Sequence, residues 1–194
     1  IFEEVLKTLD KWERQKRRKL VISTNFSGRH FDTDGEEFLN RIQHIFSKYT
    51  VPAEYVEIEV TEGVLVKNVH VLERCVNRLH EMGFRVSIDD FGTGYSSLNM
   101  IKKVYLNVIK IDKSFIPMET EYPGKETDMV MFVSIVDLVR KLGKKTIAEG
   151  VETKEQLRYL RQVGCDIVQG YVFDKPMPES EFEVRLEQGY KDEE

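Results

Sequence analysis

Residues 86–98 read Val86-Ser87-Ile88-Asp89-Asp90-Phe91-Gly92-Thr93-Gly94-Tyr95-Ser96-Ser97-Leu98. Successive side chains of a strand point to opposite faces, so both adjacent carboxylates can face one centre only at a strand end, where the backbone turns. Two hard oxygen ligands at one point suit Mg²⁺ or Mn²⁺ better than a soft metal. A helix cap would explain Asp90 alone but not the pair. The segment therefore predicts a strand that ends at a metal site.

The same pattern, a short apolar run closed by a polar residue and followed by a helix-like segment, recurs along the chain. The expected strands cover residues 20–26, 56–60, 85–88, 108–111, 146–148 and 167–172. The residues that close them are Asn25, Glu59, Asp89 with Asp90, Lys110, Glu149 and Gln169. Apolar spacing with a period of 3.6 predicts helices over 1–18, 36–49, 69–82, 96–105, 127–142, 154–163 and 178–188.

This alternation of strands and helices decides the fold class. Strands that are apolar enough to be covered on both faces predict a parallel sheet with right-handed crossovers. The spacing suits a TIM-like (β/α)8 barrel, which usually has roughly 250 residues and a site at the carboxyl ends of its strands. The 194 residues provide for about six βα units. We therefore expect an α/β, TIM-like barrel that is incomplete at its N-terminus, with two strands upstream of Ile1.

Composition places the chain among ordinary globular proteins, with 41% hydrophobic and 32% charged residues. Its net charge of -5 argues against a broad DNA or RNA surface. Cys75 and Cys165 are too few and too widely spaced for a disulfide framework. The sequence has no apolar run long enough to span a bilayer. We expect a cytoplasmic domain without a nucleic-acid partner, in a parent protein that upstream segments could anchor to a membrane.

The lysine and the remaining acids extend the expected site. Lys110 is a charge inside an apolar strand, which costs free energy unless it pairs with an acid or reaches solvent. Glu59 and Glu149 end strands and are natural metal ligands, whereas Glu62 and Glu152 are better placed for loops or for hydrogen bonds to the ligands. Ordinary surface acids are the alternative for this outer pair.

Other kinds of site have little support. Asn25 and Gln169 could each supply an amide oxygen to a metal or bind water, although either amide alone would more often be a satisfied loop residue. The histidines show no metal spacing and have no Ser or Cys nucleophile beside them. The sequence contains no P-loop and no dinucleotide-binding glycine triplet.

On these motifs the sequence resembles the EAL domains, bacterial phosphodiesterases of cyclic di-GMP. The resemblance runs from about Val5 to Leu186. Its motifs are Asn25-Phe26-Ser27, Glu59-Val60-Thr61-Glu62, the segment 89–98, Lys110-Ile111-Asp112, Ala148-Glu149-Gly150-Val151-Glu152 and Gln169-Gly170-Tyr171. The Glu-Ala-Leu signature of the family, whose Glu is a metal ligand, is not in this sequence and is expected upstream of Ile1.

The resemblance implies a modified TIM barrel that holds two Mg²⁺ or Mn²⁺ ions and hydrolyses cyclic di-GMP to linear pGpG, as a cyclic-guanylate-specific phosphodiesterase. Carried over by motif, the ligands of one ion would be Asn25, Glu59, Asp89 and Glu149. Those of the other would be Asp89, Asp90 and, through water, Gln169, which would also contact substrate. Lys110 would orient or help deprotonate the attacking water, and we count Glu62 and Glu152 with it as catalytic. Glu62 and the loop 91–98 would couple metal binding to dimerisation.

The resemblance further implies a homodimer and, in the parent protein, sensory or GGDEF-type domains. We expect the EAL-type domain to fill residues 1–190 and residues 191–194 to form a tail. Without the upstream Glu, this piece is expected to have little or no activity. Two alternatives remain: a receptor or regulatory module that binds cyclic di-GMP without hydrolysing it, and an unrelated metal-dependent barrel enzyme such as an aldolase.

Overall fold

The computed structural model describes residues 1–17, 20–31, 34–67, 69–92, 98–117 and 124–189. Its strands are β1 (Ile22–Phe26), β2 (Val56–Thr61), β3 (Arg85–Phe91), β4 (Val108–Ile111), β5 (Lys145–Ala148) and β6 (Ile167–Val168). Its α-helices are α1 (Phe2–Arg14), α2 (Glu36–Phe46), α3 (Glu62–Lys67), α4 (Val69–Glu81), α5 (Leu98–Lys103), α6 (Lys125–Lys141), α7 (Lys154–Val163) and α8 (Glu179–Gln188). Short 3₁₀ turns are η1 (Gly28–Phe31), η2 (Ala53–Tyr55) and η3 (Lys113–Phe115).

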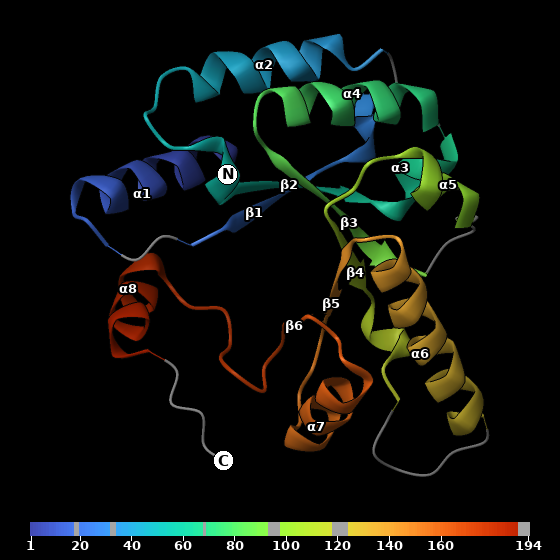
Figure 1. The fold of residues 1–194 in the computed structure, drawn as a ribbon. Helices are drawn as coiled ribbons and strands as arrows, with labels where there is room; N and C mark the ends of the chain where they lie inside the picture. Colours follow the sequence, from blue (N-terminus) through green and yellow to red (C-terminus); the bar gives the residue numbers. More distant parts are fainter. Residues whose placement is uncertain (18–19, 32–33, 68, 93–97, 118–123, 190–194) are drawn as a thin grey trace.

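The strands form one sheet in the order β1-β2-β3-β4-β5-β6, and every neighbouring pair is parallel. Sequential strands are neighbours in space, joined by helices as right-handed crossover rules require. The sheet twists strongly from β1 to β6 (Figure 1). The prediction of an α/β fold with about six βα units of a TIM-like barrel is confirmed. All carboxyl ends of the strands therefore meet at one edge of the sheet.

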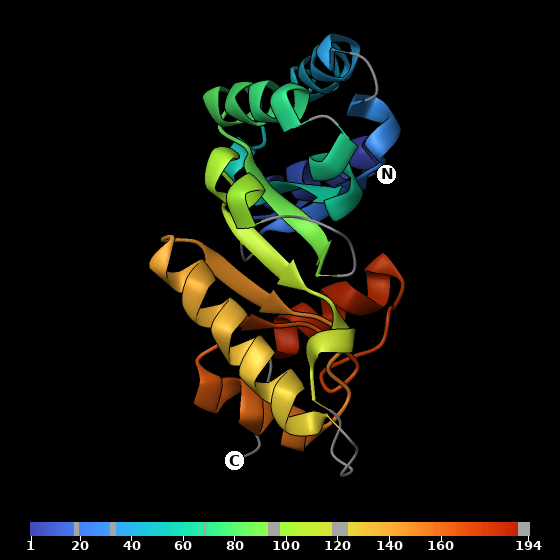
Figure 2. The ribbon, with the colours of Figure 1, turned by 90° about the vertical axis from the view of Figure 1, so that its right-hand side faces the viewer.

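Two apolar clusters hold helices against this sheet. The larger lies between the strands β1 to β4 and the helices α1, α2 and α4, and includes Leu6, Phe38, Leu72 and Ile88. The smaller packs α6 and α7 against β4 and β5 through Ile111, Phe132, Ala148 and Leu160. Figure 2 shows α2 and α4 at one end of the sheet and α6 and α7 at the other.

Local sequence signals explain where several elements begin and end. Helix α7 begins at a capping box, in which the Thr153 side chain accepts from the Gln156 backbone N–H and the Gln156 side chain accepts in return. It ends at Gly164, whose φ of 79° closes the last turn. The expected range 154–163 is therefore confirmed.

Several elements differ from the expected ranges; β3, for example, continues to Phe91 instead of ending at residue 88. Strand β6 ends at Val168 instead of residue 172, although Gln169 and Val172 still make backbone hydrogen bonds with Val151. Helix α3 begins directly at the end of β2, where no helix was expected. The helix expected over 96–105 is observed from Leu98 to Lys103, while residues 93–97 and the tail 191–194 lie outside the described residues.

No helix in the described ranges combines the length and the apolar composition needed to cross a membrane. The Cys75 thiol is buried and Cys165 is half-buried; both are free. Cys75 lies inside α4, and Cys165 follows Gly164, the C-cap of α7.

Candidate active site

Lys110 lies at the centre of a cluster of carboxylates at the carboxyl edge of the sheet. Its Nζ is 2.9 Å from Glu59 Oε1, 3.0 Å from Asp89 Oδ1 and 2.7 Å from Glu149 Oε1. Its side chain is only 4% exposed. The acids come from β2, from β3 and from the residue after β5, so one ammonium group joins four neighbouring strands.

The charges around Lys110 decide its protonation state. Burial alone would lower the pKa of Lys110, but the hydrogen bond to Glu149 and the attraction of Glu59 outweigh burial and raise it above its ordinary value. The side chain is therefore a cation at neutral pH. The expectation that this strand lysine pairs with an acid holds, and the alternative that it reaches solvent does not.

Asp89 and Asp90 are brought to one side by an irregularity in β3. Ile88 pairs with Ile109 and Phe91 pairs with Ile111, so two residues of β3 lie opposite the single residue Lys110 of β4. Two residues of one strand opposite one residue of its neighbour define a β-bulge. Asp90 adopts a φ of 55°, a left-handed conformation that is unusual for a residue other than glycine. The sequence argument placed a backbone turn at a strand end here, but β3 continues to Phe91 and the bulge is the actual cause.

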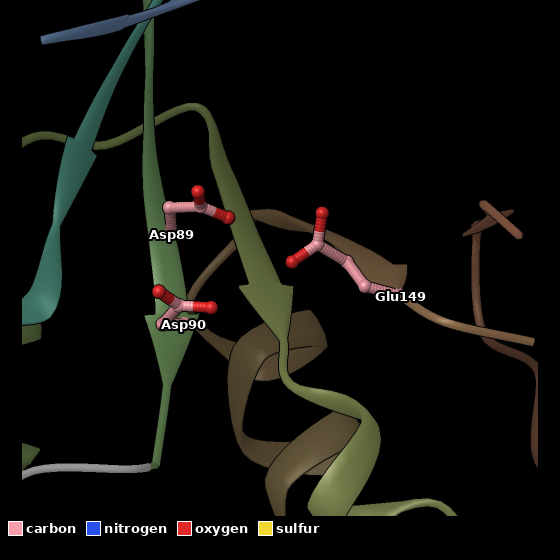
Figure 3. A group of neighbouring side chains, drawn as sticks. All are labelled: Asp89, Asp90 and Glu149. Atoms are coloured by element: carbon pink, nitrogen blue, oxygen red, sulfur yellow. The ribbon is translucent and has the colours of Figure 1, made fainter. Parts of the chain in front are cut away.

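Asp89, Asp90 and Glu149 form a group that could hold a metal ion. Each offers one carboxylate oxygen, and these oxygens lie within 4.8 Å of one another. Figure 3 shows the three side chains converging across β4. Burial raises the pKa of Glu149 to about 7, despite the opposing effect of Lys110, and burial together with Asp89 raises the pKa of Asp90. A cation would favour the ionised forms of these acids, and an all-oxygen donor set fits a hard divalent ion.

Glu62, the first residue of α3, is tied to the residue that follows β3. Its side chain is buried, and its Oε2 accepts a hydrogen bond of 3.0 Å from the backbone N–H of Gly92. The bond joins the start of α3 to the residue just after β3. It also joins Glu62 to Gly92 in the loop 91–98, of which residues 93–97 lie outside the described residues. The role of Glu62 in coupling metal binding to dimerisation stays a prediction.

Glu152 and Gln169 lie beside the cluster instead of in it. They are exposed and line a cavity of about 310 Å³ together with Glu149. The other lining residues are Asp112, Lys113, Gly150, Gly170 and Tyr171. Of these, all but Lys113 belong to the sequence motifs quoted above, although none of them was assigned a role in the site.

Asn25 does not join the carboxylate cluster around Lys110. It lies opposite Glu59 in register, as a metal ligand beside Glu59 should, but on the edge strand β1 with an exposed side chain. The sequence reasoning missed Glu57, which is buried and lies two residues before Glu59 on the same face of β2. Burial raises the pKa of Glu57, and the nearby Ser87 hydroxyl opposes this rise. The Ser87 Oγ, however, makes no hydrogen bond of acceptable geometry.

Fold and site together define a parallel α/β barrel-type domain with a lysine-centred acidic group at the carboxyl edge. The sequence profile of the EAL domain matches residues 1–176. The chain belongs to the EAL domain family. All the site residues predicted from the sequence lie within the matched range.

Relatives and solved structures agree with this assignment. The chain is 40% identical over 140 residues to the cyclic di-GMP phosphodiesterase NbdA of Pseudomonas aeruginosa, covering 72% of this chain and 18% of that protein. It is 36% identical over 183 residues to the signaling protein YkoW of Bacillus subtilis, covering 94% and 22%. The chain thus spans about a fifth of the length of these relatives.

Two solved structures have closely similar folds. The EAL domain of Mycobacterium smegmatis DcpA matches with a TM-score of 0.85 and 31% identity, covering 96% of this chain and 82% of that one. The PaMucR phosphodiesterase in complex with c-di-GMP matches with a TM-score of 0.81 and 29% identity, covering 93% and 76%.

Proposed function

We propose that the domain hydrolyses one phosphodiester bond of cyclic di-GMP to give linear pGpG, with the aid of two Mg²⁺ or Mn²⁺ ions. The observation that carries the proposal is the arrangement of Glu59, Asp89 and Glu149 around the Lys110 ammonium, with Asp90 beside them. The names of relatives support the substrate, since NbdA is a cyclic di-GMP phosphodiesterase and the PaMucR phosphodiesterase was solved with c-di-GMP.

The proposed metal ligands follow from the donor set. Asp89, Asp90 and Glu149 would hold one ion, and Asn25 and Glu59 would join Asp89 and Glu149 around the other. Bound divalent ions lower the pKa of a bridging water and offset the negative charge that develops on phosphate oxygens. In this proposal the bulge at Asp90 would let the neighbouring carboxylates of Asp89 and Asp90 serve both positions.

Lys110 would hold the three carboxylates in fixed positions and orient the attacking water. Its ammonium contacts three carboxylates at 2.7–3.0 Å, so it fixes where their other oxygens point. An always-charged donor at this position can hold a water oxygen or a phosphate oxygen in place. Glu62 would hold the base of the loop 91–98 through Gly92, and Glu152 and Gln169 would contact the nucleotide or its waters from the cavity wall.

Product formation tests the proposal. Protein that contains this domain is incubated with cyclic di-GMP and Mn²⁺, and pGpG is separated by chromatography. We expect pGpG from the native protein and from Asp137→Ala, which removes a half-exposed acid of α6, but none from Asp89→Ala. Absence of pGpG from the native protein would refute hydrolysis.

Binding without hydrolysis is the second candidate function. The observation that favours it is the exposed position of Asn25 on the edge strand: the described residues bring one three-carboxylate group together, not two complete ion sites. Equilibrium binding of cyclic di-GMP in EDTA separates the candidates. Tight binding in EDTA with no pGpG in Mn²⁺ identifies a receptor, whereas metal-dependent binding followed by turnover identifies an enzyme.

The setting of the domain is also proposed. One relative, MucR of P. aeruginosa, is a bifunctional diguanylate cyclase/cyclic di-GMP phosphodiesterase, and the chain spans 25% of it. We therefore propose that residues 1–190 act as one EAL unit of a larger protein with GGDEF-type or sensory domains. We further propose that the unit works as a homodimer in the cytoplasm and binds no DNA or RNA. Size-exclusion chromatography with light scattering tests the dimer.

A further inference from the structure

The amino edge of the sheet, where the strands begin, carries a patch of lysines. They belong to the segments before β4 and before β5, residues 101–107 and 140–146, which together contain six basic residues and no acid. The exposed lysines of these segments are Lys102, Lys103, Lys141 and Lys145. The whole chain, in contrast, has a net charge of -5. This edge is therefore locally basic in an acidic chain.

The two segments lie side by side. Strands β4 and β5 are parallel neighbours (Figure 2), and the Lys145 backbone N–H donates to the Asn107 carbonyl at 3.1 Å. The Lys144 side chain crosses between the segments, because its Nζ donates to the Leu106 carbonyl at 3.0 Å. The lysines of both segments therefore belong to one surface, which we call the basic patch.

The charge of the basic patch is not neutralised by its surroundings. None of its four exposed lysines forms an ion pair with another of the described residues. The neighbouring acids have partners of their own, Asp137 with Arg140, Glu81 with Arg78 and Asp166 with the backbone and hydroxyl of Thr146. The patch is therefore free to attract an anionic partner.

Two large apolar side chains are exposed in the same segments, Tyr105 at 64% and Leu142 at 39%. Tyr105 is held in its exposed position. Lys144 Nζ lies 5.2 Å from its ring centroid, and the His80 ring meets it edge to face at 4.9 Å. His80 Nε2 also lies 2.7 Å from the Tyr105 carbonyl oxygen. An aromatic ring that is fixed and yet mostly exposed suits a boundary between water and an apolar phase.

The helix dipole explains only part of this surface. Lys102, Lys103 and Lys141 lie in the last turns of α5 and α6, where a cation is favoured. Lys145 begins a strand, so the dipole accounts neither for it nor for the two exposed apolar side chains. The combination of unpaired lysines with an exposed Tyr and Leu is typical of a surface that lies on a membrane.

We propose that the basic patch docks the domain on a bilayer that contains anionic phospholipids. The lysines bind the headgroups, and their apolar stems reach the headgroup region together with Tyr105 and Leu142. A planar bilayer meets only the basic edge, whereas a nucleic acid that wrapped further around the acidic chain would be repelled. The strands run from this edge toward Lys110 and its acids, so the docked domain keeps that cluster facing the solution. The proposal does not depend on the hydrolysis of cyclic di-GMP.

Vesicle sedimentation of the 194-residue chain in EDTA tests the docking. Vesicles of phosphatidylcholine alone are compared with vesicles that also contain phosphatidylglycerol. We expect binding to the anionic vesicles only, and a severalfold loss of binding when NaCl is added, because salt screens exposed charges. Amide exchange of residues 101–107 and 140–146 should slow severalfold on the anionic vesicles. Exchange of Gly92, at the opposite edge of the sheet, should stay unchanged.

Two double variants separate the basic patch from general charge effects. Lys102→Gln with Lys145→Gln should weaken binding roughly thirtyfold, which corresponds to about 1 kcal/mol for each lysine near an anionic surface. Lys7→Gln with Arg41→Gln is the matched control, because it removes the same charge from exposed positions of α1 and α2. It should bind like the native chain. Tyr105→Ser should weaken binding severalfold although all the lysines remain.

Several outcomes would overturn the proposal. Absence of binding to the anionic vesicles would do so, and so would equal binding to neutral vesicles or equal weakening by the two double variants. Tighter binding of duplex DNA than of anionic vesicles, lost in Lys102→Gln with Lys145→Gln, would make the patch a nucleic-acid surface and would also overturn it.

Discussion

The charge balance of the site depends on Lys110, so its removal should expose the repulsion among the acids. Lys110→Met keeps the length of the side chain but leaves three carboxylates around an apolar group. Breaking a buried ion pair in this way costs about 3 kcal/mol or more. We expect that loss in the free energy of unfolding in EDTA, measured by urea denaturation. Mn²⁺ should restore more stability to this variant than it adds to the native protein.

The control for this prediction is Lys7→Met, which removes an exposed lysine of α1. It should change the stability little, with or without Mn²⁺, because exposed charges contribute little. If Lys110→Met were as stable as Lys7→Met in EDTA, the ammonium would not be what offsets the three acids.

Asp90 combines a strained backbone with a carboxylate of the proposed metal site, so stability and metal binding should respond in opposite directions. A residue with a side chain pays about 1 kcal/mol or more for the left-handed conformation, and glycine does not. Asp90→Gly should therefore raise the unfolding free energy in EDTA by about 1 kcal/mol, while Mn²⁺ stabilises it less than the native protein. Thermal unfolding with and without Mn²⁺ measures both effects.

Asp90→Asn distinguishes strain from charge. Asparagine tolerates the same conformation but lacks the carboxylate, so it should lose the response to Mn²⁺ and gain less stability in EDTA than glycine does. Equal gains in both variants would mean that removal of charge beside Asp89, and not relief of strain, stabilises the protein.

Between elements, the bond from Gly92 to Glu62 should hold the end of β3 against the start of α3. Glu62→Ala leaves the partly buried Gly92 N–H without this acceptor, a loss of about 1 kcal/mol. We expect severalfold faster exchange of the Gly92 amide proton by NMR. Glu62→Gln keeps an acceptor oxygen and should preserve most of the protection; similar exchange in both variants would show that the bond does not hold the loop base.

The packing of α2 on α4 depends on the absence of a side chain at Gly35. A Cβ there would collide with Cys75 Sγ, and the φ of Gly35 is 77°. Gly35→Ala should therefore destabilise the protein by about 2 kcal/mol or more, from strain and collision together. Gly143→Ala is the control, with a φ of 70° and nothing within 4 Å. It should lose only the strain energy, and an equal loss at both positions would exclude the collision.

Elements with local signals could be predicted from the sequence. Strand β4 has the expected bounds, because its four residues, three of them apolar, lie between Asn107 and Asp112. The bounds of α7 are marked by its capping box and by Gly164. Helix α3 was missed because Glu62–Lys67 is short and contains a glycine, so its sequence has no clear helical signal. Strand β6 is shorter than expected, and the close approach of Gly170 to the backbone of Val151 just after it is a tertiary contact that no local pattern reveals.

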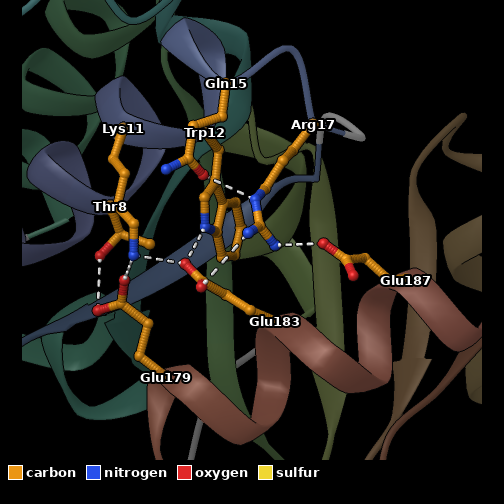
Figure 4. Close-up of polar contacts among 8 residues, drawn as sticks. All are labelled: Thr8, Lys11, Trp12, Gln15, Arg17, Glu179, Glu183 and Glu187. Atoms are coloured by element: carbon orange, nitrogen blue, oxygen red, sulfur yellow. Dashed lines mark hydrogen bonds and ion pairs between the residues drawn. The ribbon is translucent and has the colours of Figure 1, made fainter.

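For the whole molecule, the convergence of Glu59, Asp89, Lys110 and Glu149 could be foreseen, because parallel strands bring their carboxyl ends to one edge. The β-bulge could not, since it depends on the register between β3 and β4. The contact between α1 and α8, in which Lys11 Nζ lies 2.6 Å from Glu183 Oε1 (Figure 4), could not either, because it joins charges at opposite ends of the chain. Sequence reasoning therefore predicted that the acids lie at one edge of the sheet. It did not predict the β-bulge that brings the adjacent residues Asp89 and Asp90 to the same side.

The last prediction concerns how this site connects the two apolar clusters. Glu59 and Asp89 belong to strands packed in the larger cluster, Glu149 follows a strand packed in the smaller one, and β4 takes part in both. An ion held by Asp89, Asp90 and Glu149 would therefore join the two halves of the sheet. Ligand at about 100 times its Kd adds about 2.7 kcal/mol, so Mn²⁺ should slow amide exchange in α4 and in α6 alike. Glu149→Gln should abolish the slower exchange in α6. Glu152→Gln, which changes an exposed acid, should retain it. If Mn²⁺ protected only α4 in the native protein, the two halves of the sheet would not be coupled through the site.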